Sequence, residues 1–414
     1  MFLIFLFGFT VSLSPMTGLR GEAVASPADF AMILFSVIAL PVCLRQAAVP
    51  VAAPYAQPVQ NLLHQPVSQF LLLSIPLLMA TTLLNLGELH TQYSPLGRDA
   101  LSLSVSIFVS ISICACLGST YRKAFLVGFL LSTCLIMCVY LGMALTGIGY
   151  NADGRFIGLA FNPNQTALHS LAAIIVIYFT ISKMPAGLRG LKLILSLAIL
   201  ASLFVGIASA SDAFMGSALI IVTALAFGIF EKLFGDKLRA FAVLSFLTLS
   251  GIGATILLNP RFIASVWEGV TTSFTLGNQD TDRFLLWGNG VTAWLERPFL
   301  GNGIGAWSGA SGPFGGIEAH NSFIDWISIT GILGGALYAA FLLKIFRFPF
   351  WNEPVRYGIF FGVILYISFG FFFRNPIYWL IMAFVFDGYD VLQPSKRLHR
   401  ASTQKFTTIP VGRA

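Results

Sequence analysis

The chain has 414 residues, of which 57% are hydrophobic and 10% are charged, and its formal net charge is +7. A soluble domain carries roughly a quarter charged residues, so this composition excludes an ordinary soluble protein. Long apolar runs, such as residues 124–150, are also unlike β-barrel strands, which alternate in hydrophobicity over short segments. We therefore predict an all-α, polytopic integral membrane bundle that contacts membrane lipid.

Twelve apolar stretches approach the roughly 20 residues that a membrane-spanning helix needs. The first is short and lacks a basic leading segment, so we expect a retained helix rather than the apolar core of a signal peptide. The last is interrupted by Asp387. The predicted spans cover residues 2–15, 29–45, 69–88, 101–118, 124–148, 164–182, 190–209, 212–231, 239–258, 321–346, 356–373 and 375–391.

The lysines and arginines indicate how the bundle is oriented. With the N-terminus in the cytoplasm, 17 of the 24 fall on the cytoplasmic side, and the positive-inside rule favours this arrangement with an even number of spans. Every cation on the opposite side is an arginine. This pattern arises either by chance or because a planar guanidinium holds a phosphate through two hydrogen bonds. The outer set is Arg20, Arg98, Arg155, Arg261, Arg283, Arg297 and Arg374.

The chain divides by position into three parts. We expect N-terminal transmembrane helices in residues 1–150, a second membrane region in residues 151–392, and a basic cytoplasmic tail in residues 393–414 that can touch anionic lipid heads. Basic residues are spread over many loops, so no nucleic-acid partner is indicated. The five cysteines lie in apolar runs without His or carboxylate neighbours, so neither a metal, a disulfide nor a cofactor is indicated.

One large loop, residues 259–320, leaves the membrane on the non-cytoplasmic side. Within it, residues 282–297 have apolar side chains near helical spacing, Asp282 can cap the start, and Pro298 follows the end. This pattern predicts an amphipathic helix that lies on the membrane surface or covers a cavity. The stretch that follows, "PFLGNGIGAWSGASGPFGG", overlaps a dinucleotide-binding motif, but no βαβ unit surrounds it. A flexible loop whose backbone approaches a ligand is the better interpretation.

Three stretches resemble the superfamily of O-antigen ligases and Wzy-type polysaccharide polymerases. They are "GRFIGLAFNPNQTA" (154–167), "DRFLLWGNGVTAWLERPFLGNGIGAW" (282–307) and "HNSFIDWISITGILGG" (320–335). The resemblance covers about residues 150–390. It implies a bacterial inner-membrane glycosyltransferase of about a dozen helices, with its active site facing the periplasm and no metal. Such an enzyme moves a glycan from an undecaprenyl-pyrophosphate-linked donor to a saccharide or lipid A–core acceptor, and polymerase and ligase are not separable from this sequence.

Under this resemblance, His320 is the candidate catalytic base, because a neutral imidazole can take the proton of an acceptor hydroxyl. The leaving pyrophosphate needs a cation. Arg283 is the first candidate for this role and Arg155 is the second. Without the resemblance, His320 is equally a polar residue at a membrane interface.

The sequence departs from the family pattern at two positions. The family shows an arginine where "ASASDAF" (208–214) has Asp212, so the phosphate-binding cation is missing or comes from Arg155 or Arg374. Asp212 then orients a sugar hydroxyl or an arginine, or it simply caps the next helix. The family also often has a glutamate near the position of Thr330.

Several other polar residues are candidates either for the site or for a structural role. Asn162, Pro163 and Asn164 break helix geometry, so Asn162 and Asn164 either line the glycan site or mark where the chain enters the next span. Asn321 follows His320 and is a further candidate substrate contact. Asp325 either caps the helix after His320 or contacts sugar. His169 lies inside a predicted span, where we expect a hydrogen bond to a neighbouring helix.

The competing class is a membrane transporter or a flippase for a lipid-linked glycan. A transporter is expected to carry ionisable residues at mid-membrane, and a flippase is expected to have cations inside a central cavity. In this chain most charges lie at the predicted interfaces and cluster in the external loop, which favours chemistry at a surface.

Overall fold

The computed structural model describes residues 1–14, 27–48, 65–84, 96–152, 154–160, 162–185, 187–234, 279–305, 307–309, 317–345 and 354–387. Within these ranges the chain forms twelve α-helices and one short 3-10 helix. The α-helices are α1 (Phe2–Leu13), α2 (Pro27–Ala48), α4 (Pro66–Leu84), α5 (Leu96–Gly118), α6 (Arg122–Leu145), α7 (Pro163–Lys183), α8 (Arg189–Ala208), α9 (Asp212–Phe234), α12 (Gln279–Glu296), α13 (Ser322–Ile345), α14 (Pro354–Ile367) and α15 (Pro376–Asp387), and the 3-10 helix is η3 (Trp307–Gly309).

Eleven of the twelve predicted spans coincide with described helices, and the remaining one, residues 239–258, lies outside the described residues. The span predicted at 356–373 is too long, because α14 ends at Ile367 and residues 368–375 form a loop. Pro376 disfavours helical geometry at the preceding residue, so α15 begins at Pro376 and does not extend back into the loop. This loop contributes to the site described below.

Seven of the described helices are long and apolar enough to cross a bilayer, and four further apolar helices are shorter. The seven lie in α2, α4, α5, α6, α7, α8 and α13. The described part of the chain is therefore an all-α, membrane-embedded bundle, as its composition predicted.

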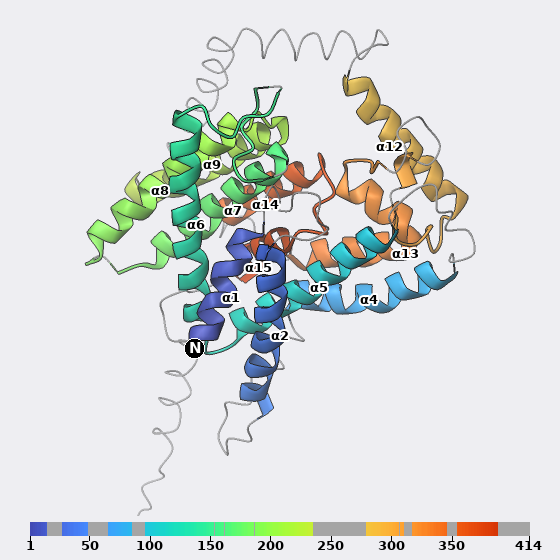
Figure 1. Cartoon of the computed structure of the whole chain (residues 1–414), viewed down its shortest axis with the longest axis horizontal. Coiled ribbons are helices and arrows are strands. Elements are labelled where there is room, and N and C mark those ends of the chain that lie inside the picture. Colours follow the sequence, from blue (N-terminus) through green and yellow to red (C-terminus); the bar gives the residue numbers. More distant parts are fainter. Residues whose placement is uncertain are drawn as a thin grey trace, which may run out of the picture.

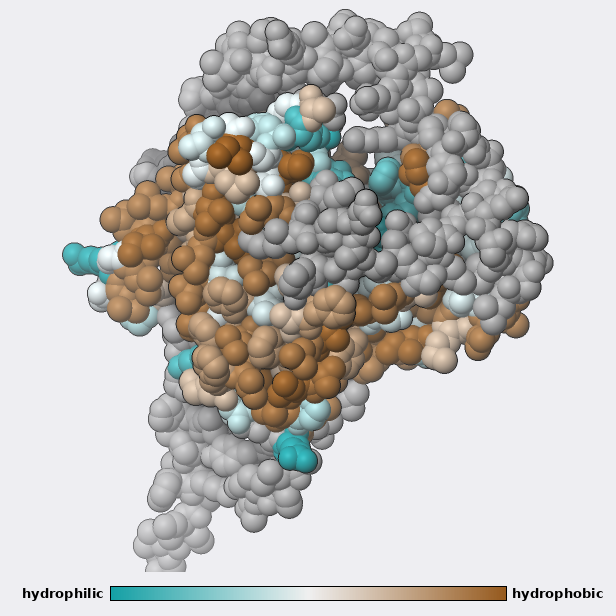
Figure 2. Space-filling view, in the orientation of Figure 1, coloured by the Kyte–Doolittle hydropathy of each residue, from teal (hydrophilic) through white to brown (hydrophobic). Residues whose placement is uncertain are grey.

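The outer surface of the bundle supports the same conclusion. Figure 2 shows hydrophobic residues over a broad, continuous part of the visible face. On α6 the exposed apolar side chains recur every four residues, so they form one stripe along the helix. Each is about half exposed: Val127, Leu131, Leu135 and Val139. A soluble monomer rarely exposes so large an apolar surface, whereas lipid tails cover it readily.

Helices α7 and α15 form the centre of the bundle. Residues 166–177 of α7 are all buried, as are residues 376–385 of α15. The two helices pack against each other, and α7 also contacts α6, α8 and α9. In Figure 1 they lie between the upright α6 on one side and the group of α4, α5 and α13 on the other.

Small residues allow two pairs of helices to approach closely. A Cβ atom added at Gly8 of α1 would lie 2.0 Å from the Phe125 carbonyl oxygen of α6, and one at Gly128 would lie 2.0 Å from the Phe5 carbonyl oxygen. On α14, an added Cβ at Gly358 would lie 2.1 Å from Cβ of Ala224 on α9. Such contacts between small residues are a common way to pack helices in lipid.

Helix α4 packs against both α5 and α13, and an aromatic cluster fills the space between them. The Phe70 ring of α4 lies 5.5 Å from Trp326 and 5.0 Å from Phe341, both on α13. It also lies 5.3 Å from Trp379 on α15. Each such ring pair contributes about 0.5–1.5 kcal/mol beyond its buried area. The cluster fixes α13, which carries the candidate site at its N-terminus.

Candidate functional site

The turn before α13 is held in place by two polar side chains. The Asn321 side-chain oxygen accepts hydrogen bonds from the backbone N–H groups of Phe323 (3.0 Å) and Ile324 (3.3 Å), so Asn321 caps the helix. The buried Asp325 carboxylate accepts from the N–H groups of Ala319 (2.8 Å) and Asn321 (3.2 Å). Asp325 therefore holds the turn before the helix, the cap itself is Asn321, and a contact of Asp325 with sugar stays a prediction.

His320 lies between the two amides that Asp325 holds. Its side chain is exposed, whereas Ala319 and Asn321 are buried. Its φ is +52°, in the left-handed region that non-glycine residues seldom occupy. Unusual backbone of this kind is found at functional sites, where the surrounding structure must compensate for its cost. The turn therefore fixes the backbone at His320 and leaves its side chain exposed.

Helix α13 begins at Ser322 and is interrupted at Gly331. Gly331 has φ +66° and ψ −164°, outside helical geometry, so the helix has an N-terminal half over residues 322–330. The break leaves backbone groups without helical partners. The glycine-rich loop provides these partners, because the N–H groups of Asn302 and Gly303 donate to the carbonyls of Ser328 and Ile329, each at 2.9 Å.

The same loop also accepts hydrogen bonds from the far side of the break. Ile332 donates its N–H to the Pro298 carbonyl at 2.7 Å, and Leu333 donates to the Phe299 carbonyl at 3.4 Å. Residues 301–305 of this stretch are non-helical, and their backbone approaches α13 closely, while the predicted approach to a ligand stays a prediction. Non-helical backbone at membrane depth is stable only where protein surrounds it or it lines a watery cavity.

The 368–375 loop fastens the start of α13 from another side. The Ser322 hydroxyl donates to the Gly370 carbonyl at 2.5 Å and accepts from the Phe372 N–H at 3.0 Å. On the same loop, an Arg374 guanidinium nitrogen lies 2.6 Å from a carboxylate oxygen of Glu318, two residues before His320. The Arg374 guanidinium also lies over the Phe371 ring, 5.2 Å from its centre. The His320 turn is therefore attached to this loop on both sides.

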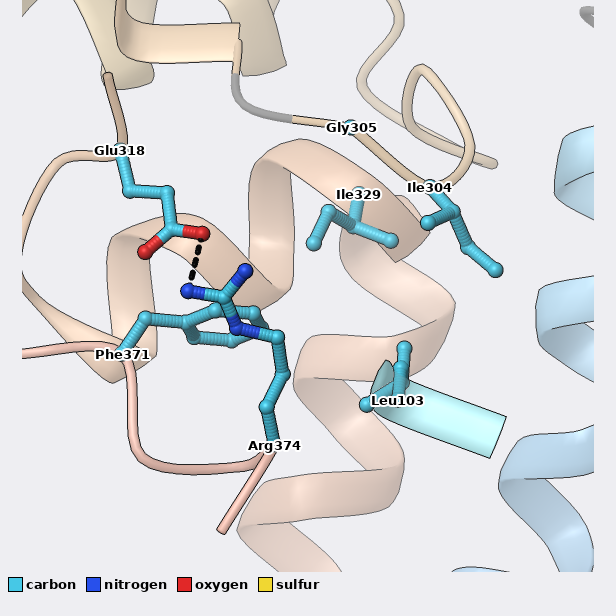
Figure 3. Close-up of a pocket in the computed structure, with 7 residues that line it drawn as sticks. All are labelled: Leu103, Ile304, Gly305, Glu318, Ile329, Phe371 and Arg374. Carbon is cyan, nitrogen blue, oxygen red and sulfur yellow. Dashed lines mark ion pairs between the residues drawn. The ribbon is translucent and has the colours of Figure 1, made fainter. Parts of the chain in front are cut away.

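A small pocket opens beside this ion pair. Figure 3 shows Glu318 and Arg374 facing each other at one end, with Phe371 beneath the guanidinium. Apolar side chains from α5, α13 and the glycine-rich loop provide the other walls: Leu103, Ile329 and Ile304. The pocket thus combines an apolar wall with a charged pair, and one member of that pair, Glu318, lies two residues before His320 in the chain.

A second group of predicted residues gathers where α7 begins. Asn162 caps α7 by accepting from the Asn164 N–H at 2.7 Å, and Pro163 takes the first helical position. The motif starts a helix, as one of its two interpretations predicted, and a contact of Asn162 or Asn164 with glycan stays a prediction. The Asn164 side-chain oxygen accepts from the Ser211 hydroxyl at 3.0 Å. Arg155, half-buried, donates from Nε to the Ser209 carbonyl at 3.2 Å.

Tyr366 of α14 connects the two groups. Its hydroxyl donates to the Asn164 carbonyl and interacts electrostatically with Arg155. Its ring centre lies 4.8 Å from that of Phe372, on the loop that holds Ser322. A chain of direct contacts therefore runs from the α7 start to the His320 turn. Tyr366 and Glu318 were not predicted as site residues, because an isolated tyrosine or glutamate in a sequence gives no spacing signal.

Two predicted residues are only partly described. The backbone of Arg283 lies in α12 and that of Asp212 starts α9, but their side chains lie outside the described residues. The predicted amphipathic helix is present as α12. It begins at Gln279, so Asp282 lies in its first turn rather than at its cap. Acidic residues are favourable there as well, since the N-terminus of a helix carries partial positive charge.

His169 forms the interhelical hydrogen bond that its position predicted. It is fully buried in α7, and Nε2 lies 3.2 Å from the Ser12 hydroxyl of α1. Ser12 in turn lies 2.9 Å from the Thr133 hydroxyl of α6. These three side chains join three helices in the interior of the bundle, so we assign His169 to packing rather than to the surface site.

Among the residues that the structure describes, no group of His, Cys, Asp or Glu side chains is arranged to hold a metal ion. No family model matches the chain, and no curated protein matches it. The His320 turn and the residues attached to it are therefore the features of this structure that bear most directly on function.

Proposed function

We propose that the protein is a metal-independent membrane glycosyltransferase of the O-antigen ligase or Wzy-type polymerase kind. It moves a glycan from an undecaprenyl-pyrophosphate-linked donor to a saccharide or lipid A–core acceptor on the periplasmic face of the bacterial inner membrane. The observation that carries this proposal is the exposed His320, held in left-handed backbone geometry by Asp325 at the start of a broken membrane helix.

In the proposed reaction, His320 accepts the proton of an acceptor hydroxyl as its oxygen attacks the anomeric carbon of the donor glycan. The new glycosidic bond forms as the bond between the anomeric carbon and the pyrophosphate oxygen breaks. Undecaprenyl pyrophosphate leaves with that electron pair. A general base of this type contributes about 10²–10⁴-fold to rate.

The departing pyrophosphate requires positive charge nearby. Arg283 and Arg155 remain the proposed contacts, and Arg155 is half-buried in the group around Asn164. The twelve-span topology and the placement of the 259–320 loop in the periplasm belong to the same proposal. Polymerase and ligase share this donor and this chemistry and differ in the acceptor.

His320→Ala tests the proposal directly, with His320→Gln as a variant that keeps a polar side chain but is not a base at neutral pH. Both should be present in membranes at wild-type abundance and should lower glycan transfer at least about 100-fold. The measurement is surface polysaccharide by gel together with lipid-linked donor on each side of the membrane. His399→Ala, in the predicted cytoplasmic tail, is the matched control and should not change the polysaccharide.

The location of the accumulated donor separates the proposal from its alternative. A failed transferase leaves donor on the periplasmic side, because the donor has already crossed the membrane. Loss of a flippase leaves donor on the cytoplasmic side. Normal polysaccharide in His320→Ala would remove the proposed base and with it the proposed function.

A further inference from the structure

We infer that the Glu318–Arg374 ion pair positions the His320 turn, and that Arg374 influences transfer through Glu318 rather than by contact with the donor. The consequence for catalysis rests on the proposed function, whereas the positioning itself does not. The paired atoms are 2.6 Å apart, and the side chains are 13% and 25% exposed. Water therefore screens this pair less than a pair on an open surface.

The position of the pair in the chain supports this role. His320 has Glu318 on one side and Ser322 on the other, and both are bonded to the 368–375 loop, Glu318 through Arg374 and Ser322 through Gly370 and Phe372. The loop thus holds the turn before and after the histidine. Without Arg374, the attachment at Ser322 is kept, whereas the segment that leads into His320 loses its contact with this guanidinium.

The charges around the turn lead to the same conclusion. The buried Asp325 carboxylate interacts electrostatically with both Glu318 and Arg374. Arg374 is therefore the cation that both acidic side chains share. Without its charge, Glu318, the more exposed of the two acids, loses the partner that holds it beside the turn.

The guanidinium is also already engaged by protein groups. Its nitrogen contacts Glu318, and its plane lies over the Phe371 ring. These two contacts orient the guanidinium and hold Glu318 whether or not the remaining N–H donors bind another group. A positioning role is consistent with both contacts at once.

The first measurement is hydrogen–deuterium exchange of the Ala319 and Asn321 amides in the purified full-length protein. Glu318→Gln and Arg374→Gln should each raise exchange at these amides at least about threefold, within the range for one partly exposed ion pair. The double variant should be no worse than either single one, because both remove the same contact. Exchange at the Gly303 amide, which is bonded to Ile329, should not change.

The second measurement is glycan transfer by the same variants in membranes. The two single variants should lose transfer to a similar extent, Arg374→Lys should keep most of it, and the exchanged pair Glu318→Arg/Arg374→Glu should recover at least half of the wild-type rate. Arg189→Gln, which removes an exposed arginine at the start of α8 on the predicted cytoplasmic side, is the matched control and should change neither readout.

Two results would overturn the inference. One is unchanged amide exchange in all variants. The other is a loss of transfer in Arg374→Gln that greatly exceeds the loss in Glu318→Gln and is not recovered by the exchanged pair, since that is the signature of direct donor contact. Failure of the proposed function looks different, because amide exchange would still respond to the variants while His320→Ala would leave the polysaccharide unchanged.

Discussion

At the scale of single residues, Asp325 holds the backbone on both sides of His320. Each of its two carboxylate oxygens accepts one backbone N–H, from Ala319 at 2.8 Å and from Asn321 at 3.2 Å. Buried N–H groups are costly to leave without an acceptor, so this carboxylate and the left-handed residue between the two amides depend on each other.

Asp325→Asn is expected to destabilise the protein by about 1–3 kcal/mol, because an amide offers one oxygen and leaves one buried N–H without an acceptor. The measurement is thermal unfolding of the purified protein in detergent. Ser328→Ala is the matched control on the same helix, since the Ser328 hydroxyl donates only within the helix, to the Asp325 carbonyl at 3.0 Å. Equal unfolding temperatures for Asp325→Asn and wild type would show that the turn does not depend on the carboxylate.

At the scale of elements, the break in α13 and the glycine-rich loop form one unit. The loop exchanges four backbone hydrogen bonds with the interrupted helix. Gly301 and Gly331 meet at the contact, where a Cβ atom on Gly301 would lie 2.5 Å from the Gly331 nitrogen. Neither position tolerates a side chain, and Gly331 in addition has backbone angles that only glycine adopts without strain.

Gly331→Ala is therefore expected to cost at least about 3 kcal/mol, the upper end of the range for one strained residue, because its Cβ would also lie 2.3 Å from the Phe299 carbonyl oxygen. Membrane abundance and unfolding temperature should both fall. Gly142→Ala in α6 is the matched control, since a Cβ there meets nothing within 4 Å. Comparable behaviour of the two variants would mean that the break in α13 is not a specific structure.

Sequence patterns account well for the elements and only partly for the site. Apolar runs predict helices because each span must satisfy its own backbone hydrogen bonds in lipid. They do not predict where a helix is broken internally, so the "TGILGG" stretch reads as continuous although Gly331 interrupts it. His320 could be identified from its neighbours in sequence. The contact of Arg374 with Glu318 and that of Tyr366 with Asn164 could not be predicted. Each joins distant segments of the chain that only the fold brings together.

At the scale of the whole molecule, the orientation of the bundle decides whether His320 can meet a donor that has already crossed the membrane. Three predicted spans separate residue 188 from His320. Two of them are described as α8 and α9, and the third, residues 239–258, lies outside the described residues. An odd number of crossings places the two positions on opposite sides. The excess of Lys and Arg around residue 188 places that position in the cytoplasm.

Cysteine labelling tests this arrangement in a chain whose five native cysteines are replaced by alanine. In spheroplasts, a membrane-impermeant maleimide should label His320→Cys, whereas Leu188→Cys, 44% exposed, should react only after the membrane is permeabilised. Labelling of both positions in intact spheroplasts would mean that an even number of the three predicted spans cross the bilayer. Labelling of residue 188 alone would invert the orientation and place His320 in the cytoplasm, where the proposed transfer to a periplasmic acceptor cannot occur. The expected result fixes the sidedness of the site independently of any activity, so it constrains the transferase and the flippase interpretations equally.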